Sequence, residues 1–463
     1  MLALAAALLL AQVPDLPRPG GAAPPPAADE AATPSGRYTI ERIRLEGLRR
    51  TQEWAVRAHL TVAEGRVLDD EQVLVSRLRL LQLGWYSRVE TRVEKGSQRG
   101  LVVLVFTLVE RNTLIVSDLV LGSTGPEPFY GGFGLSQQNF LGEGLGLSGA
   151  FVTGGAPPGR PLEPTRAAAR ASFFAPDVLL GGSRPRLVAG ASLLALRGEE
   201  YACADPSCRD FRGRWSDAPR LRYSRLGGEV VAGIRPGPFE RLFAGYRLER
   251  VEGTAVTGAD PLAAVAWPSL QVGRRLLTAL TGTYDRDTRD DFFFPREGTR
   301  FSAQVTFASP ALGGDYEYAR WLVTAETAVG LPRGHALKLL GAAGATQGNA
   351  PFFDRFYAAD WAYFSLGPAL GRALELNFGT DSRYDALLAM AGAEYGIPLW
   401  SRGDFFHRGY LAIGARAVYS AAAARASRTP QSRTPLSGDL ALRLDTPVGS
   451  FNLSLGYALD VYQ

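Results

Sequence analysis

Histidine, cysteine and methionine are scarce in this chain of 463 residues, which contains three, two and two of them. A zinc site of the usual Cys/His kinds needs a cluster of such ligands, and the sequence offers none. A Ser-His-Asp hydrolase would need one of the histidines, but His59 lies in a helical pattern and His335 and His407 lie at turns between predicted strands. We therefore expect no enzymatic activity, no catalytic residue, no metal and no cofactor.

A large excess of charge and long apolar runs are also missing. Fifty basic residues against 46 acidic ones leave a net charge of +4, which gives no reason to expect nucleic acid as a partner. No stretch after the first eleven residues reaches the roughly 18 consecutive apolar residues of a membrane-spanning helix. With 46% apolar and 21% charged residues, the composition is that of a folded chain.

The N-terminal region has the pattern of an exported protein. Residues 1–11 form a short apolar run that resembles the central region of a secretory signal peptide. The positively charged residues that usually precede this region are missing. A mis-assigned start codon would explain their absence, and so would a protein that is not secreted. Residues 12–36 hold seven prolines among alanine and glycine, a composition that favours a flexible linker. We predict a signal peptide over 1–11 and a linker over 12–36.

Residues 37–111 have the pattern of a small α+β domain. The expected order is strand, helix, helix, strand, strand, over 38–45, 51–60, 69–81, 86–94 and 101–109. Thr51 is expected to cap the first helix, and Asp69 with Gln72 to form a capping box at the second.

Beside this order stands a set of apolar, aromatic and glycine residues: Ile40, Ile43, Gly47, Gly65, Leu78, Leu81, Gly84, Trp85, Tyr86 and Val89. Together they resemble a POTRA domain, the periplasmic module of outer-membrane assembly and translocation proteins. The alternative is a small α+β domain with no client. An open strand edge can bind an extended peptide through its unpaired N–H and C=O groups. We expect such a client-binding edge at Arg88, Val89 and Val93.

Residues 112–463 alternate apolar residues with polar or small ones. Phe301, Val305 and Phe307, for example, interleave with Ser302 and Thr306. A period of two places each set on one face of a strand. The segments run about ten residues, which suits a strand that crosses a bilayer at a tilt, whereas strands of soluble sheets are shorter on average. The pattern favours a transmembrane antiparallel β-barrel over a soluble all-β fold.

We predict fifteen strands in this region. Their connections alternate between tight turns, as at 139–144 and 332–334, and long polar or proline-rich loops, as at 347–383. Short periplasmic turns and long outer loops are typical of outer-membrane barrels. The predicted strands are 114–121, 130–138, 145–153, 165–174, 186–197, 221–233, 240–251, 274–285, 299–308, 315–331, 335–346, 384–397, 409–420, 438–445 and 450–459.

Four turn motifs occur along this region: Gln138–Gly144, Asp287–Asp290 with Pro295 and Gly298, Pro351–Tyr357, and Asp445–Gly449. They resemble the BamA/TamA-type outer-membrane assembly factor superfamily, which also includes two-partner secretion transporters. Their family order behind one POTRA-like domain extends the resemblance over about residues 38–463. It implies a barrel of usually sixteen strands, surrounded by outer-membrane lipids in a Gram-negative bacterium, with the POTRA domain in the periplasm.

The sequence departs from the family at the sixth outer loop. There the resemblance implies an Arg-Gly-aromatic latch whose guanidinium pairs with an aspartate on the barrel wall. The loop at 347–383 lacks that motif, and Gly371 with Arg372 is the nearest substitute. The tripeptide that starts at Arg408 begins a strand at the opposite end, and no aspartate occurs in 411–416. The latch motif is therefore degenerate.

Two further features of the barrel are its seam and a pair of cysteines in one outer loop. Our count of fifteen strands leaves a strained or open seam between the first and last strands, unless one strand has been missed. In this superfamily the seam is the proposed lateral gate. In the outer loop at 198–220, Cys203 and Cys208 could form a disulfide in an oxidising compartment.

We expect a factor for outer-membrane protein assembly and insertion or for polypeptide translocation. It would capture a client strand at the POTRA edge and hand it over at the barrel seam. Its partners would be client polypeptides or a secreted protein, with periplasmic accessory proteins. The alternatives are an outer-membrane transport or secretion pore and a structural barrel without a latch.

Overall fold

The chain is described from a computed structural model. Every statement below refers to the residues that it describes, which are 38–122, 130–154, 166–178, 187–201, 220–255, 273–291, 294–356, 386–400, 405–421, 432–433, 436–446 and 449–459. The predicted signal peptide, the linker and the long loops at 202–219, 256–272, 357–385 and 422–431 lie outside this set.

The first domain is a three-stranded mixed sheet packed against two helices. Strand β1 runs parallel to β3, and β2 runs antiparallel to β3, so the order is β1-β3-β2 and β2 is an edge strand. Neither helix is long and apolar enough to cross a membrane. The elements are β1 (Thr39–Glu46), α2 (Glu53–Arg57), α3 (Asp70–Gln82), β2 (Tyr86–Lys95) and β3 (Leu101–Glu110).

The helix starts agree only in part with the sequence prediction. Asp69 is the N-cap of α3, and its carboxylate accepts from the Glu71 backbone N–H at 2.9 Å. Thr51 does not cap α2. Gln52 is the N-cap there, without a side-chain hydrogen bond. The Thr51 hydroxyl instead accepts a hydrogen bond from Asn139 of the barrel, a contact between distant residues that local sequence does not signal.

The core of this domain lies between the sheet and the helices. Because side chains alternate along a strand, the apolar residues of one sheet face meet the apolar side of each helix. At roughly 25 cal/mol per Å² of buried apolar surface, this cluster is the main source of the domain's stability. The buried residues are Ile40, Ile43, Ala55, Val56, Leu60, Leu68, Leu80, Trp85, Tyr86, Val89, Val102, Leu104, Phe106 and Leu108.

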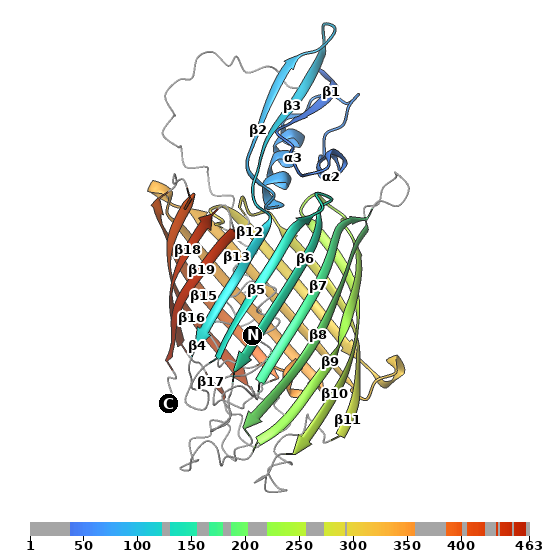
Figure 1. Cartoon of the computed structure of the whole chain (residues 1–463), viewed down its shortest axis with the longest axis vertical. Coiled ribbons are helices and arrows are strands. Elements are labelled where there is room, and N and C mark those ends of the chain that lie inside the picture. Colours follow the sequence, from blue (N-terminus) through green and yellow to red (C-terminus); the bar gives the residue numbers. More distant parts are fainter. Residues whose placement is uncertain are drawn as a thin grey trace.

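The second sheet has sixteen strands and curls into a barrel below the first domain (Figure 1). Fifteen of them follow one another, each antiparallel to the next, and the two-residue β17 pairs beside β16. All fifteen predicted strands are present. They are β4 (Leu114–Gly122), β5 (Tyr130–Phe140), β6 (Leu145–Gly154), β7 (Arg166–Val178), β8 (Leu187–Tyr201), β9 (Arg220–Ile234), β10 (Glu240–Ala255), β11 (Gly273–Asp287), β12 (Gly298–Ala308), β13 (Tyr318–Gly330), β14 (Ala336–Gly348), β15 (Leu387–Trp400), β16 (Arg408–Ala421), β18 (Leu436–Thr446) and β19 (Gly449–Leu459), with β17 at Ser432–Arg433.

The barrel has an apolar outside and a polar inside. Phe301, Val305 and Phe307 of β12 are 39%, 56% and 50% exposed, and they face outward as the alternation predicts. The charged side chains on the other face, such as Arg225 and Glu394, are buried in the interior. A soluble sheet would bury the aromatic face instead, so this arrangement is that of a membrane barrel.

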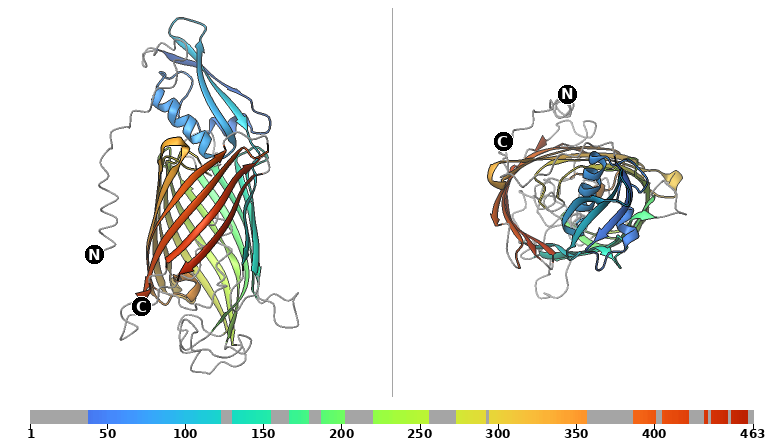
Figure 2. Two further views of the ribbon diagram at one scale, coloured as in Figure 1. Left: turned by 90° about the vertical axis from the view of Figure 1, so that its left-hand side faces the viewer. Right: turned by 90° about the horizontal axis from the view of Figure 1, so that it is seen from above.

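The tight turns lie at the end of the barrel that carries the first domain. Seen along the barrel axis, that domain lies over the barrel mouth (Figure 2). The described connections include short 3-10 helices at Pro310–Leu312, Pro332–Gly334 and Phe352–Asp354.

Candidate functional site

The seam of the barrel is the first candidate site. Strands β4 and β19 end the ordered path of the sheet and lie next to each other (Figure 1). Among the described residues, β4 pairs only with β5 and β19 only with β18, so the sheet is not closed by a hydrogen-bonded ladder. An unpaired backbone group in lipid costs several kcal/mol. A polypeptide strand that paired with these edges would remove that cost.

The predicted client-binding edge is an edge in the structure. Strand β2 pairs on one side only, with β3. Arg88 and Val93 are exposed, whereas the Val89 side chain is buried in the domain core. The Val89 carbonyl accepts a hydrogen bond from Arg77 Nε of α3 at 2.9 Å. The accessible part of this edge is therefore the half beyond Val89, and whether it binds a client stays a prediction.

The turn between β5 and β6 joins the first domain to the barrel rim. The Trp85 indole donates to the Gln138 carbonyl at 3.0 Å, and the Gln52 backbone N–H donates to the Gly142 carbonyl at 2.9 Å. Asn139 donates to the Thr51 hydroxyl at 2.9 Å. Main-chain and side-chain hydrogen bonds thus fix the orientation of the domain.

Glycine is required in that turn by conformation and by space. Gly142 and Gly144 have φ of +74° and +75°, in the region that favours glycine. A Cβ on Gly142 would collide with the Arg50 carbonyl oxygen, and one on Gly144 would lie 2.7 Å from the Trp85 ring. The motif Gln138–Gly144, which the sequence identified only by resemblance, is therefore the docking turn of the first domain.

Glu110 at the end of β3 holds the loop that meets this turn. Its carboxylate accepts from the backbone N–H groups of Arg50 and Thr51 at 3.0 and 2.9 Å. Partial burial acts to raise the pKa of Glu110, but the hydrogen bonds from Thr51 and its neighbours outweigh it. The pKa of Glu110 is therefore lowered from its ordinary value.

A second contact joins α3 to the connection between β11 and β12. Gln82 Nε2 donates to the Arg289 carbonyl at 2.6 Å. The Arg289 guanidinium pairs with Asp287 at 2.8 Å and with Glu326 of β13 at 3.0 Å. The first domain is thus attached at two separated points on the rim, which restricts its rotation.

The start of the sixth outer loop is fixed inside the barrel by a carboxylate. Asp354 accepts from Arg247 Nη1 of β10 at 2.9 Å and from the Tyr318 hydroxyl of β13 at 2.5 Å. Arg247 also pairs with Glu249 at 2.7 Å. In this contact the loop supplies the acid and the wall supplies the arginine, which is the reverse of the latch that the sequence led us to look for.

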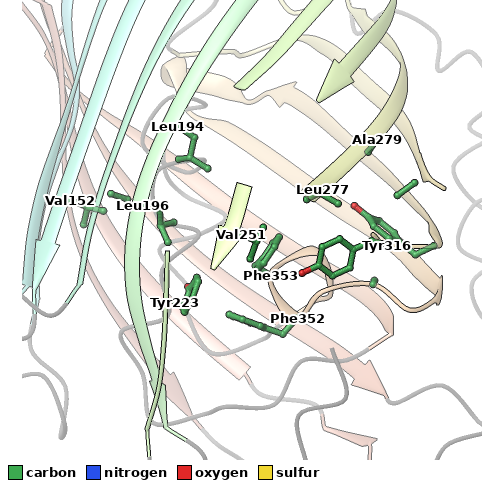
Figure 3. Packing of buried hydrophobic residues seen from close by; sticks show 14 of the residues in the cluster. Val152, Leu194, Leu196, Tyr223, Val251, Leu277, Ala279, Tyr316, Phe352 and Phe353 are labelled. Carbon is green, nitrogen blue, oxygen red and sulfur yellow. The ribbon is translucent and has the colours of Figure 1, made fainter. Parts of the chain in front are cut away.

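Two aromatic side chains reinforce that attachment. Phe352 meets Tyr223 edge to face, with ring centroids 4.9 Å apart, and Phe353 stacks on the same tyrosine. The Arg225 guanidinium lies 3.9 Å from the Phe353 ring centroid, a cation–π contact. Figure 3 shows Phe352 and Phe353 among apolar side chains from several strands of the wall, including Val251.

Several predicted residues lie outside the described part of the chain. Gly371 and Arg372, the candidate latch, are among them, and so are Cys203 and Cys208. The stretch 411–416, where the resemblance implies an aspartate, contains none, and the buried Arg416 in it pairs with Asp439 of β18 at 2.7 Å. Sequence reasoning missed Asp354, Arg247 and this pair, because partners on different strands leave no local signal.

Comparison with known proteins decides the family. The model of the Omp85 superfamily domain matches residues 139–463, and the POTRA model described as surface antigen variable number repeat matches residues 38–111. The chain belongs to the Omp85 superfamily. As an Omp85 protein it is an outer-membrane β-barrel of a Gram-negative bacterium with its POTRA domain in the periplasm, so the rim at β5–β6 is the periplasmic rim.

One curated relative of this Omp85 chain is the outer membrane protein assembly factor BamA of Nitratidesulfovibrio vulgaris. The two are 25% identical over 327 residues, which cover 69% of this chain and 36% of that protein. The chain thus spans about a third of the length of the relative it matches.

Two solved structures are similar to this Omp85 chain. CdiB from Escherichia coli has a TM-score of 0.59 at 13% identity, and the match covers 91% of this chain and 73% of that one. BamA from Haemophilus ducreyi lacking POTRA domains 1–3 has a TM-score of 0.49 at 16% identity, covering 92% and 82%. The likeness to CdiB concerns the fold.

Proposed function

We propose that this Omp85 protein assists the assembly and insertion of outer-membrane proteins or the translocation of polypeptides, without a chemical step or cofactor. The observation that carries the proposal is the seam, where two strand edges lie side by side without a shared ladder. The match to an assembly factor supports the same role.

The proposed mechanism uses strand pairing at two places. A client strand first adds to the exposed half of the β2 edge, where main-chain groups give affinity without demanding one sequence. It then passes to the seam, where β4 or β19 offers a second edge. Until the client is handed over, the docked POTRA domain holds β2 above the barrel mouth (Figure 2).

Depletion of the protein tests the proposal. We expect folded outer-membrane proteins, or one secreted polypeptide, to fall in amount when the protein is depleted and to recover with a plasmid copy. Quantitative mass spectrometry of outer membranes and culture medium measures both. Unchanged amounts of every outer-membrane and secreted protein would contradict the proposal.

A transport pore predicts a different result. A pore that passes solutes conducts ions in planar bilayers without any client. If the proposed function is correct, the conductance of the purified barrel stays low, because the attached loop segment lies in the barrel and the POTRA domain lies over its mouth. Steady conductance combined with normal outer-membrane protein levels would favour the pore.

A further inference from the structure

Arg111 makes an ion pair across the seam. It lies in the short connection between the POTRA domain and β4, and its Nη2 donates to Asp445 Oδ1 at 2.6 Å. Asp445 lies on β18, where it is the register partner of Ser450 on β19. The contact therefore joins the chain just before the first barrel strand to the hairpin that ends the sheet.

The second oxygen of the same carboxylate is held from the barrel side. Arg408 of β16 donates to Asp445 Oδ2 through Nε and Nη2 at 3.1 and 3.0 Å. Arg408 also donates to Asp291 Oδ2 at 2.7 Å, and its guanidinium lies 5.0 Å from the Phe294 ring centroid. Asp445 thus keeps one arginine partner when the other leaves.

The position of Arg111 depends on the POTRA domain. Its backbone N–H donates to the Trp85 carbonyl at 2.9 Å, and the Trp85 indole donates to Gln138 on the barrel rim. Trp85 is 2% exposed in the POTRA core, so it moves with that domain. A rotation of the POTRA domain on the rim would pull Arg111 away from Asp445.

We propose that the Arg111–Asp445 ion pair is a releasable lock on the periplasmic end of the seam, opened by movement of the POTRA domain. The use of such a lock rests on the proposed function, in which the seam must open to receive a client strand. The existence of the lock does not rest on that function, because the ion pair joins the first and last parts of the barrel sheet whether or not a client binds.

A second arginine lowers the cost of breaking this ion pair. The side chains of Arg111 and Asp445 are 10% and 7% exposed, so a carboxylate left without any partner there would be poorly solvated. Arg408 still neutralises Asp445 when Arg111 leaves. The pair is therefore suited to release.

Hydrogen exchange of the purified full chain in detergent micelles tests the lock. We expect Arg111→Ala and Asp445→Asn each to raise exchange about tenfold in peptides from 114–122 and 449–459, because edge strands that are no longer held together fray from their single partners, β5 and β18. Asp445→Asn also weakens the contact with Arg408, so the double variant should exchange no faster than Asp445→Asn, which already lacks the ion pair with Arg111. Peptides from β9 and β10, which are paired on both sides, should not change.

Matched controls keep the test decisive. Arg99→Ala removes an exposed arginine at the tip of the POTRA hairpin and should leave seam exchange as in the unchanged protein. The heat-dependent shift on electrophoresis shows that each variant is folded, and Arg111→Gln serves if Arg111→Ala does not fold. Unchanged seam exchange in folded variants overturns the lock. Raised seam exchange in the variants supports the lock. If depletion of the protein also leaves outer-membrane protein levels unchanged, that second result counts against the proposed function alone.

Discussion

Among the single side chains inside the barrel, Asp354 is the clearest anchor. Its contacts with Arg247 and Tyr318 fix the start of the sixth outer loop. The side chains of Arg247 and Asp354 are only 15% and 13% exposed, so losing one charge leaves the other poorly solvated. We expect Asp354→Asn to lower the free energy of unfolding by about 3 kcal/mol. Urea unfolding in detergent micelles measures the change.

Glu252→Gln on the same strand as Arg247 is the matched control. Glu252 is 40% exposed and pairs with Arg250 and Arg274 at 3.5 and 3.4 Å. An exposed pair of this kind contributes at most about 1 kcal/mol, so the control should unfold nearly as the unchanged protein does. Equal unfolding of the two variants would show that Asp354 does not anchor the loop.

The anchor also shows what the sequence could not predict. Asp354 and Arg247 lie on different elements, and nothing local distinguishes them from the other acidic and basic residues of the barrel. The family resemblance directed attention to an arginine in the loop, whereas the observed pair has the opposite arrangement. A charge pair between distant residues becomes visible only when the register of the strands is known.

At the scale of elements, the β5–β6 turn fixes the POTRA domain. A side chain at Gly142 is strained by its positive φ and would collide with the Arg50 carbonyl. We expect Gly142→Ala to displace the domain and expose the connection at Arg111, so that trypsin cleaves there at least several times faster. N-terminal sequencing of the fragments measures the site.

Gly146→Ala provides the comparison on the neighbouring strand. A Cβ at Gly146 would meet Phe174 at an ordinary 3.5 Å, so this variant should be cleaved at the rate of the unchanged protein. If Gly142→Ala is equally resistant, the turn does not determine the position of the domain.

Acid should weaken the same junction through Glu110. A carboxyl whose pKa is lowered by folding contributes stability that is present above its unfolded pKa and is lost as the pH falls through its folded pKa. We expect the urea midpoint of the POTRA domain to be lower at about pH 3.5 than at about pH 7, with the loss beginning only below about pH 5, and to fall less in Glu110→Gln. The helical circular dichroism signal follows this domain. An equal fall in both proteins would exclude Glu110 as the cause.

The barrel strands were predictable from the sequence, because every backbone N–H and C=O group of a chain in lipid must be paired. Residues that face lipid and residues that face the interior alternate, so each strand shows its period directly, as at Phe301, Val305 and Phe307. The helix starts were less predictable. Asp69 caps α3 as expected, but Thr51 serves the barrel turn instead of α2, because a tertiary contact competes with the local one.

On the scale of the whole molecule, the structure combines a barrel wall that is braced by ion pairs with a weakly closed seam between β4 and β19. Ion pairs brace the wall between its strands, as Arg443 of β18 and Glu394 of β15 do across β16 at 2.6 Å, whereas β4 and β19 share no ladder among the described residues. The fifteen-strand count predicted an open or strained seam, and the open path of the sheet agrees with it. The docking of the POTRA domain over the mouth could not be predicted, since it depends on contacts between regions far apart in the chain.

The proposed capture of a client at the β2 edge involves the whole molecule, and Val93 allows a test. A carbonyl that accepts from a helix, as that of Val89 does from Arg77, points out of the β2–β3 ladder. Val93, four positions later, presents its N–H on the same outward side. Proline there removes a donor that only an added strand would use, so the domain should still fold.

We therefore expect Val93→Pro to fail in restoring outer-membrane protein levels after depletion, with at least a several-fold deficit. Val93→Ala keeps the N–H and should restore them, which separates main-chain pairing from side-chain contact. The abundance and the heat-dependent shift of both variants must match, because a misfolded barrel would give the same deficit. Full restoration by Val93→Pro would remove β2 from the proposed mechanism and leave the seam as the place where client strands pair.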